Sequence, residues 1–433
     1  MKRNKHRIVW FLWLVGMCLC LTGCGDLADI LDITVKDIVW EGEQTGDQVQ
    51  SEESGQHFKE PPAESISEFF EESVSAREED SQDAAVFLME EAGDYAYNCL
   101  NETEKLWYQD LEKLFGTFGE SCRLSDEGLD AGLTEENIDR IFQCVLYDHP
   151  ELFFVDGYSY TKYSMAGKLI SIEFSGTYSM DRETALTRKE EIEAAVDEIL
   201  AGISQSASEY EKVKYVYDWI ITDTEYDLDS SDNQNIYSVF IHHLSVCQGY
   251  SKATQYLLNR LGIECALVLG TVDTGEGHAW NLVKIDGSYY YLDTTWGDAS
   301  YRLTGSSGDS VDMSTVNYDY LNVTTEELLR THRIVAGIPM PECVATEANY
   351  YVREGALFTE YNKDRIGKLF AGMEDGSKNA VTIKCADRDC YEEIRVALVE
   401  KQEIFQFLGE LEQKVTFSQN ETQLSMTFWV TNE

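Results

Sequence analysis

The chain has 433 residues, of which 43% are hydrophobic and 12% aromatic, enough for about three folded domains. Its 79 acidic and 34 basic side chains give a formal net charge of −45 at pH 7. Such a surface repels nucleic-acid phosphates and anionic lipid headgroups, which excludes a DNA- or RNA-binding role. We attribute this charge to solubility and infer no substrate preference from it.

The first 24 residues have the pattern of a bacterial export signal. Basic residues up to Arg7 precede the apolar run IVWFLWLVGMCLCLTG, which is shorter than the ~20 residues of a spanning helix. The run ends in LTGC, which resembles a lipobox with Cys24 as the residue to be lipidated. A one-pass anchor is the alternative, but the small residues before Cys24 favour cleavage. We therefore expect a lipoprotein signal peptide over 1–24 and an exported protein, held at the outer face of the bacterial cell membrane by acyl chains alone.

Residues 25–83 are predicted to be an acidic flexible linker. Between residues 41 and 82 the chain is acidic, rich in Ser and Gln and poor in aliphatic residues. Such a segment cannot bury enough apolar surface to offset the entropy of ordering it. Ordered structure is expected to begin near Ala84.

The eleven cysteines contain no CxxC pair, so neither a zinc cluster nor a disulfide framework is indicated. Cys385 and Cys390 are near enough in sequence to pair in an oxidising compartment, a question that the sequence leaves open.

Residues 84–205 are predicted to form an N-terminal α+β region. Helical patterns and alternating strand patterns follow one another: helices at 85–116, 136–150 and 181–203, and strands at 158–164 and 168–178. Ala166 and Gly167 indicate a hairpin between the strands. His149 precedes a proline at a helix end, and we assign it a structural role.

A small C-terminal α+β domain is predicted over 345–433. Its expected order is strand, helix, strand, helix and a final hairpin: 350–358, 364–373, 380–385, 391–411 and the segment ending in LSMTFWVTN. It shows no cluster of catalytic residue types, so we expect it to bind a ligand or to support the packing of the rest.

Residues 245–262, SVCQGYSKATQYLLNRLG, have the pattern of an amphipathic helix. Apolar residues recur at the spacing of one buried face: Tyr250, Ala253, Leu257, Leu258 and Leu261. Ser245 is expected to cap the start and Gly262 to end the helix. Cys247 then lies in the first turn, where unpaired N–H groups and the helix dipole favour a thiolate. A buried, inert thiol is the alternative.

A hairpin is predicted soon after this helix. Asp286-Gly287 separates two alternating runs and indicates a two-residue loop. That register places Trp280 opposite Asp293, and His278 opposite Thr295. Because side chains alternate along a strand, His278 and Asp293 lie diagonally on one sheet face, at roughly 7–8 Å between backbones. An imidazole and a carboxylate can meet across that distance.

These residues together suggest nucleophilic catalysis. A cysteine nucleophile needs a base, and the base needs an orienting group. We therefore predict Cys247 as the nucleophile, His278 as its base and later the acid, and Asp293 as the group that holds the imidazole tautomer. Taken alone, His278 could be a structural histidine of the hairpin and Asp293 a cap at the end of a strand. The order and geometry of all three residues together favour catalysis.

Three segments resemble the transglutaminase-like domain, a papain-like thiol fold found in many bacterial surface proteins: SEYEKVKYVYDWIITDTEYD, VCQGYSKATQYLLNRLGI and HAWNLVKIDGSYYYLDTTW. The resemblance covers about residues 208–335 and implies an α+β core in which the helix bearing the cysteine packs on an antiparallel sheet. It also implies a triad, which falls on Cys247, His278 and Asp293 without departure. We expect the catalytic domain at 206–336.

For the predicted oxyanion site, one donor is assigned and the second has two candidates. The backbone N–H of Cys247 supplies one hydrogen bond. Tyr226 and Gln248 are candidates for the second donor, and packing is the alternative for each. Trp280 and Trp296 flank the site and either line a groove for the acyl donor or pack the core.

No metal and no cofactor are predicted. The adjacent His242 and His243 invite a metal interpretation, but on an extended segment they point to opposite faces and no carboxylate or cysteine set completes a site. Neither a phosphate-binding glycine loop nor a dinucleotide fingerprint occurs in the sequence.

The sequence thus predicts a transglutaminase-like thiol enzyme that acts on amide or peptide bonds through a thioester. The acyl group passes to water, as in a peptidase or amidase, or to an amine, as in a cross-linker. We favour water slightly, because it is the default acceptor. The expected partner is a protein or peptide substrate, cell-wall peptides included. The alternative is a catalytically silent binding or adhesion module, although such a module has no physical need for an activated thiol.

Overall fold

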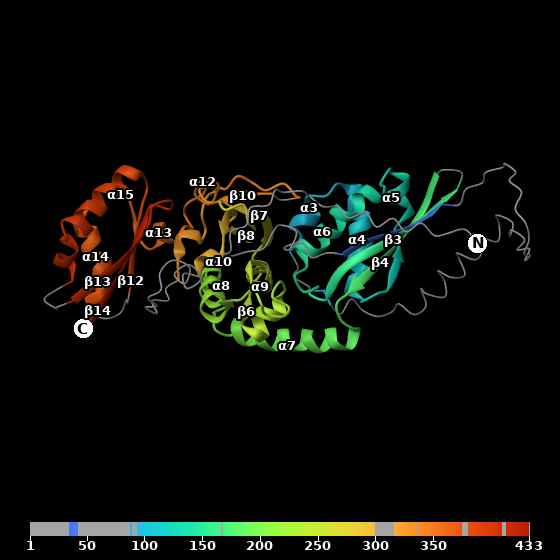
Figure 1. The fold of residues 1–433 in the computed structure, drawn as a ribbon, viewed down its shortest axis with the longest axis horizontal. Helices are drawn as coiled ribbons and strands as arrows, with labels where there is room; N and C mark the ends of the chain where they lie inside the picture. Colours follow the sequence, from blue (N-terminus) through green and yellow to red (C-terminus); the bar gives the residue numbers. More distant parts are fainter. Residues whose placement is uncertain are drawn as a thin grey trace, which may run out of the picture. The chain divides into compact units, whose positions relative to one another are not determined.

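The computed structural model describes residues 34–41, 87–88, 93–165, 168–298, 316–335, 337–374, 380–408 and 413–432, and Figure 1 labels its elements. The predicted signal peptide, with Cys24, lies outside these residues. The chain divides into two compact units, the first built mainly from Ile33–Glu90 and Leu100–Leu186, the second from Glu91–Cys99 and Thr187–Glu433. Among the described helices, none is both long and apolar enough to cross a bilayer.

Unit 1 is a four-stranded sheet with helices packed against it. The strands lie in the order β1-β3-β4-β2, which are Thr34–Glu41, Val155–Met165, Lys168–Tyr178 and Ser121–Arg123. The helices are α4 (Glu102–Gly116), α5 (Asp126–Asp130) and α6 (Ile138–Asp148). Aromatic rings join the layers: Phe115 of α4 meets Phe174 of β4 at 6.1 Å, and Phe142 of α6 meets Tyr158 of β3 at 4.7 Å. The predicted pairing of the two strands and the helix at 136–150 are confirmed, while Ala166 and Gly167, expected to form the turn, lie outside the described residues.

β1 lies inside residues 25–83, which the sequence predicted to be a flexible linker. The structure differs there, because β1 pairs in parallel with β3 along its whole length. Its sequence, TVKDIVWE, is rich in residues that favour strands. The composition that argued for a linker begins only at Glu41, the last residue of this strand.

The core of unit 2 is an antiparallel sheet with helices on it. The strands lie in the order β10-β7-β8-β9, which are His332–Ile334, Cys265–Val272, Gly277–Ile285 and Ser288–Leu292. The helices are α7 (Arg182–Leu200), α8 (Glu209–Asp223), α9 (Cys247–Arg260) and α10 (Thr294–Gly297). Ser208 caps α8 in a capping box with Glu211, and Arg260 ties α9 to Asp197 of α7 at 3.1 Å. A short helix, α3 (Tyr95–Asn98), also belongs to this unit.

The predicted hairpin between β8 and β9 is confirmed in type and register. Ile285 pairs with Ser288 across the two-residue loop. Asp286 and Gly287 have φ values of 49° and 81°, the left-handed geometry that a two-residue hairpin requires. β9 ends at Leu292, so the strand stops just before Asp293.

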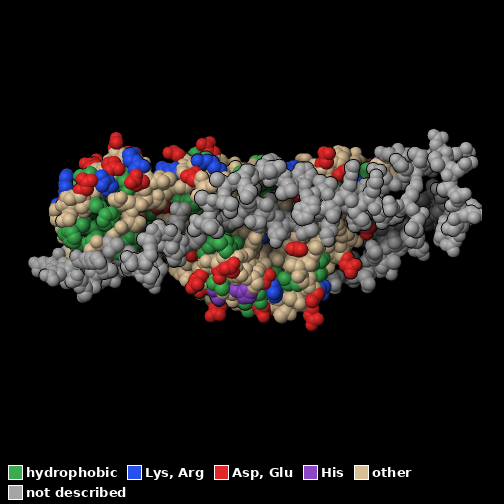
Figure 2. All heavy atoms as spheres, in the orientation of Figure 1, with side chains coloured by type: hydrophobic (Ala, Val, Ile, Leu, Met, Phe, Trp, Pro, Cys, Tyr) green, Lys and Arg blue, Asp and Glu red, His purple; other side chains and the backbone are tan. Residues whose placement is uncertain are grey.

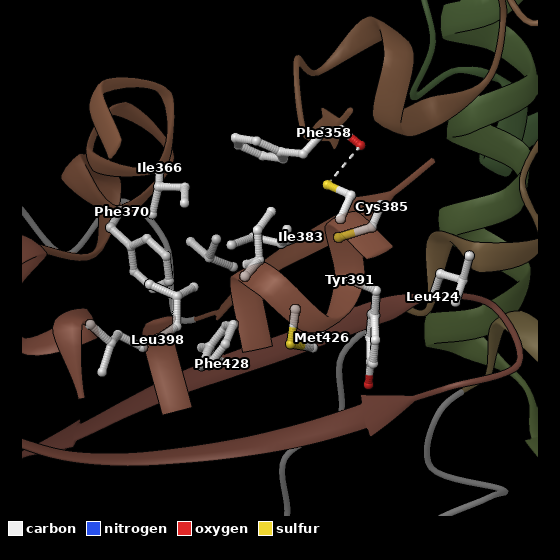
Figure 3. Close-up of a cluster of buried hydrophobic side chains, with 14 of the residues drawn as sticks. Phe358, Ile366, Phe370, Ile383, Cys385, Tyr391, Leu398, Leu424, Met426 and Phe428 are labelled. Atoms are coloured by element: carbon white, nitrogen blue, oxygen red, sulfur yellow. Dashed lines mark hydrogen bonds between the residues drawn. The ribbon is translucent and has the colours of Figure 1, made fainter. Parts of the chain in front are cut away.

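The C-terminal domain is a sheet covered by helices. Its strands lie in the order β11-β12-β14-β13, which are Leu357–Phe358, Ala380–Cys385, Ser425–Asn432 and Gln413–Asn420. The helices are α13 (Tyr350–Arg353), α14 (Lys363–Glu374) and α15 (Arg388–Arg395). Figure 3 shows the buried core, in which Ile366 and Phe370 of α14 are directed toward Ile383 of β12. Met426 and Phe428 of β14 belong to the same cluster.

Two predictions for this domain are wrong. The strand expected at 350–358 is strand only at Leu357–Phe358, because the Asn349 side chain caps Tyr351 N and starts the helix α13 over Tyr350–Arg353. The long helix expected at 391–411 is α15 followed by two short pieces, η4 (Val396–Glu400) and η5 (Glu403–Phe407). Gln402, with φ 57°, interrupts the helix and changes the direction of the chain between them.

Buried polar contacts join the C-terminal domain to the core of unit 2. Lys384 Nζ of β12 lies 3.2 Å from Asp319 Oδ1 of η3 (Tyr318–Tyr320). The hydroxyl of Ser425 donates to Asp319 Oδ2 at 2.6 Å, and the amide of Asn420 donates to the same oxygen at 3.2 Å. The charge of Asp319 is therefore compensated almost wholly by the C-terminal domain.

Candidate active site

Cys247 is the first residue of α9 and is 3% exposed. The expected cap at Ser245 is wrong: the N-cap is Val246, and Ser245 belongs to β6 (Leu244–Ser245), where its hydroxyl donates to Asn233 O at 2.7 Å. Val246 has no side-chain oxygen, so it cannot take up the N–H groups of the first turn. The residue that precedes the helix therefore does not cap the first turn, which bears the thiol.

A glycine allows the close approach of β6 to this turn. A Cβ at Gly249 would lie 1.9 Å from Ser245 Oγ and 2.9 Å from Asn233 O. No larger residue fits there without moving backbone. The position of Cys247 thus depends on Gly249 as well as on the buried apolar face of α9.

His278 and Asp293 meet as the hairpin predicted. His278 is on β8 and Asp293 follows β9, and both are buried, at 0% and 1% exposure. Nε2 of His278 donates to Asp293 Oδ2 at 2.7 Å. Thr295, expected opposite His278, is instead in α10, because Asp293 caps that helix and its Oδ1 accepts from Trp296 N at 3.0 Å.

The contact between α9 and β8 places Cys247 at the His278 end of the strand. Asn281 Nδ2 of β8 donates to Ser251 O of α9 at 2.9 Å, and Asn259, later in α9, accepts at Oδ1 from the first N–H of β7, which pairs with the far end of β8. The helix therefore runs along β8 in the direction of the strand. Cys247 precedes Ser251 as His278 precedes Asn281.

A second histidine, which the sequence analysis did not single out, joins the site. His332 begins β10, is fully buried, and directs Nε2 to Asp293 Oδ2 at 3.0 Å. Within the part of the chain that the structure describes, His278, Asp293 and His332 are the one group whose three ligand atoms, all within 4.8 Å of one another, could hold a metal ion. Both Nε2 atoms already pair with the carboxylate, so hydrogen bonding satisfies the group without a metal.

The charge state of Asp293 follows from these partners. Burial alone would raise the pKa of Asp293, but His278 and then His332 outweigh it and hold the pKa well below its ordinary value. The group is therefore a carboxylate over the whole physiological range, able to accept from both imidazoles.

The two predicted oxyanion candidates, Tyr226 and Gln248, lie on different elements. Tyr226 is in β5 (Glu225–Tyr226) and pairs in parallel with Ser245, two residues before the thiol, while its ring lies 6.2 Å from that of Tyr250. Gln248 follows Cys247 directly, and its Oε1 is buried without a hydrogen-bond partner among the described atoms. Tyr226 is thus tied to the strand that precedes α9, and Gln248 lies in the first turn of the helix beside Cys247.

The remaining predicted aromatic and histidine residues lie in packed or surface positions. Trp280 is fully buried and its ring stacks 5.9 Å from that of His278, while Trp296 is 8% exposed and lies 6.0 Å from it. Both therefore pack the site from within. His243 Nδ1 lies 2.7 Å from Asp223 Oδ2 on the surface, and neither it nor His242 belongs to the group of potential metal ligands found among the described residues.

One face of the molecule shows how the acidic side chains of the described residues are distributed (Figure 2). On the face drawn in Figure 2, the Asp and Glu side chains are dispersed over the described residues and do not gather into one patch. On this face the acidic side chains are therefore spread out and not concentrated at one place.

Residues 196–294 match the family model of the transglutaminase-like superfamily. This stretch includes α8, α9 and both strands of the His278 hairpin. The chain therefore contains a transglutaminase-like domain within a mixed α+β architecture.

Curated relatives and solved structures are similar to part of the chain. The mouse (Mus musculus) kyphoscoliosis peptidase is 24% identical over 132 residues, 27% of this chain and 20% of that protein, and its human (Homo sapiens) counterpart is 25% identical over 121 residues, 24% of this chain and 18% of that protein. This chain thus spans about a fifth of the length of those relatives. Among solved structures, a TGase (15% identity, 37% of this chain and 54% of that one, TM-score 0.24) and a candidate cysteine protease from Cytophaga hutchinsonii (15%, 31% and 61%, TM-score 0.22) are similar.

Proposed function

We propose that residues 206–336 form a thiol enzyme acting on amide or peptide carbonyls, with Cys247 as nucleophile, His278 as base and Asp293 as the orienting group. The buried 2.7 Å hydrogen bond between His278 Nε2 and Asp293 Oδ2 is the observation that supports this most directly. A carboxylate on Nε2 holds the ring and stabilises its charged form. Nδ1 is then the nitrogen that exchanges a proton with the thiol.

The reaction follows from these roles in two halves. The Cys247 thiolate attacks the carbonyl carbon, and the C–N bond breaks as His278 gives its proton to the leaving amine, which leaves a thioester. His278 then takes a proton from the acceptor that attacks the thioester. Collapse of this second intermediate releases the acyl product and restores the thiol.

Negative charge develops on the carbonyl oxygen in both halves. The backbone N–H of Cys247, in the uncapped first turn of α9, is directed to stabilise it. Tyr226 O–H and the Gln248 amide are the proposed second donors. The dipole of α9 adds to the same stabilisation.

Water is the acceptor that we favour, which makes the activity that of a peptidase or amidase. The peptidase names of the mouse and human relatives agree with this choice. Transfer to an amine, and hence cross-linking, uses the same residues and differs only in how the acceptor is bound. The proposed substrate is a protein or peptide at the bacterial cell surface, where the lipobox-like LTGC and Cys24 would anchor the chain.

The second candidate function is a catalytically silent binding module, which the near-complete burial of Cys247 favours. In that case the thiol is part of the packing, and its reactivity will match that of the other buried cysteines.

Iodoacetamide labelling of the full chain at about pH 6, followed by peptide mapping, separates the two. An activated Cys247 reacts faster than Cys343, an internal control because burial raises the pKa of the Cys343 thiol to about 12. The His278→Ala variant should lose this difference. If Cys247 in the native protein reacts no faster than Cys343, the thiol-enzyme proposal is wrong.

A peptide pool then identifies the acceptor. Incubation with and without a primary amine, read by mass spectrometry, gives shortened or deamidated products if water is the acceptor, and amine adducts if cross-linking dominates. Cys247→Ala should abolish both kinds of product.

A further inference from the structure

Asp293 Oδ2 is shared by two imidazoles. It accepts from Nε2 of His278 at 2.7 Å and from Nε2 of His332 at 3.0 Å, while Oδ1 accepts from the backbone N–H of Trp296 at 3.0 Å. A lone hydrogen bond to His278 would let the carboxylate rotate about its Cα–Cβ and Cβ–Cγ bonds. With three donors from three segments of the chain, the carboxylate has one orientation.

His332 is itself held at both ring nitrogens. Its Nδ1 lies 2.8 Å from the hydroxyl oxygen of Thr331. Because Asp293 is a carboxylate and can only accept, Nε2 of His332 must carry a proton. In the neutral ring Nδ1 is then an acceptor, so the Thr331 hydroxyl donates to it and selects the tautomer that serves Asp293.

The surroundings of His332 exclude water from this arrangement. Its ring centroid lies 4.7 Å from that of Trp296, 4.9 Å from Trp280 and 5.6 Å from Tyr320. All of these rings are buried. In such a site a hydrogen bond to a charged group is stronger than at the surface, and the loss of one donor is correspondingly more costly.

β10 brings His332 to this place through the sheet. The strand pairs with β7, with His332 opposite Val272 and Ile334 opposite Gly270. Gly270 is also the partner of His278 on the other side of β7. The two histidines thus come from strands that flank a common neighbour, which fixes their separation.

We propose that His332 is a positioning residue for the reaction: an imidazole whose Nε2–H holds the Asp293 carboxylate in the orientation that serves His278. This inference rests on the proposed thiol-enzyme function. It assigns a role in turnover to a histidine outside the Cys247, His278 and Asp293 set. His332 itself touches neither the substrate nor the thiol in this role.

Acyl transfer from p-nitrophenyl acetate in the full chain tests the proposal. His332→Phe keeps the ring and removes the donor, and should lower the Cys247-dependent acylation rate by about tenfold to a hundredfold, the value of a hydrogen bond to a buried charge. His332→Gln places an amide N–H near the position of Nε2 and should stay within about threefold of the native rate. If His332 only packs, His332→Phe should acylate faster than His332→Gln, because Phe fills the aromatic site better than Gln.

The outcomes are separable. If the native protein shows no more acylation than Cys247→Ala, the proposed function fails; if the native protein acylates and His332→Phe matches it, only the role of His332 fails. Should His332→Phe not fold, Thr331→Val removes the hydroxyl that selects the tautomer and should still slow acylation by about threefold or more. Stoichiometric, tight zinc binding by Cys247→Ala that is lost in His332→Phe would show a metal site and overturn the hydrogen-bonding assignment.

Discussion

A buried ion pair braces the segment next to the candidate site, and the structure defines the cost of removing it. Asp319 Oδ1 and Lys384 Nζ lie 3.2 Å apart, and each side chain is 3% exposed. Tyr320, the residue after Asp319, accepts the backbone N–H of Asp293 at its carbonyl, at 3.0 Å. The C-terminal domain therefore supports the position of Asp293 through this pair.

The magnitude follows from the geometry. At 3.2 Å and an effective dielectric constant of about 20, the attraction is about 5 kcal/mol. Lys384→Met leaves the Asp319 carboxylate buried with only neutral donors, so we expect local stability to fall by about 3–5 kcal/mol. In the double variant Lys384→Met/Asp319→Asn no buried charge remains, and much of the loss should return. The expected coupling energy is about 3 kcal/mol.

Hydrogen exchange read by mass spectrometry suits this chain of several domains, since one global unfolding transition is not expected of it. Exchange in peptides from β12, β14 and residues 317–324 should quicken in Lys384→Met and recover in the double variant. Arg395→Met is the matched control, because its ion pairs with Glu392 and Glu400 are at the surface, where such pairs contribute little to stability. If the losses of stability in Lys384→Met and Asp319→Asn simply add in the double variant, the two side chains do not form the stabilising pair described here.

Two further predictions concern other parts of the chain. Burial lowers the pKa of His149, but Glu151 and Glu112 outweigh this and raise it to about 10. His149→Gln should therefore cost on the order of 4 kcal/mol of local stability near pH 6, read by hydrogen exchange in peptides from α4 and α6. Because the pKa is raised on folding, this cost should shrink from about pH 6.5 toward 10, and a cost that grows with pH would contradict the reasoning. A Cβ at Gly270 would lie 2.1 Å from Arg333 O, so Gly270→Ala should displace β10, cost about 1–3 kcal/mol and reduce any Cys247-dependent acylation. Gly337→Ala, with nothing within 4 Å, should change neither, and equal effects of the two would refute the argument.

The hairpin that joins His278 to Asp293 could be predicted because its determinants are local. Asp286-Gly287 defines the loop, the loop defines the register, and the alternation of side chains then decides which residues share a face. The buried face of α9 was equally visible in its spacing. The structure added that Asp293 caps α10, which a strand pattern does not reveal.

Other features had weak or conflicting local signals. Ser245 is a good capping residue by type, but its hydroxyl is engaged by Asn233 and Ser238, so the helix begins after Val246. The helix expected at 391–411 has suitable composition, yet Gln402 adopts positive φ and breaks it. In these places tertiary contacts outweigh propensity.

By itself the sequence determined the helix that carries Cys247, the hairpin that carries His278, and the proximity of Asp293 to that histidine. Each depends on backbone periodicity and turn chemistry within a few residues. The tertiary structure alone decided that His332, in a three-residue strand with no periodic pattern, shares the Asp293 carboxylate, and that Lys384 neutralises Asp319 from another domain. Contacts between distant segments depend on how sheets and helices pack, and no local pattern encodes the partner of a buried charge.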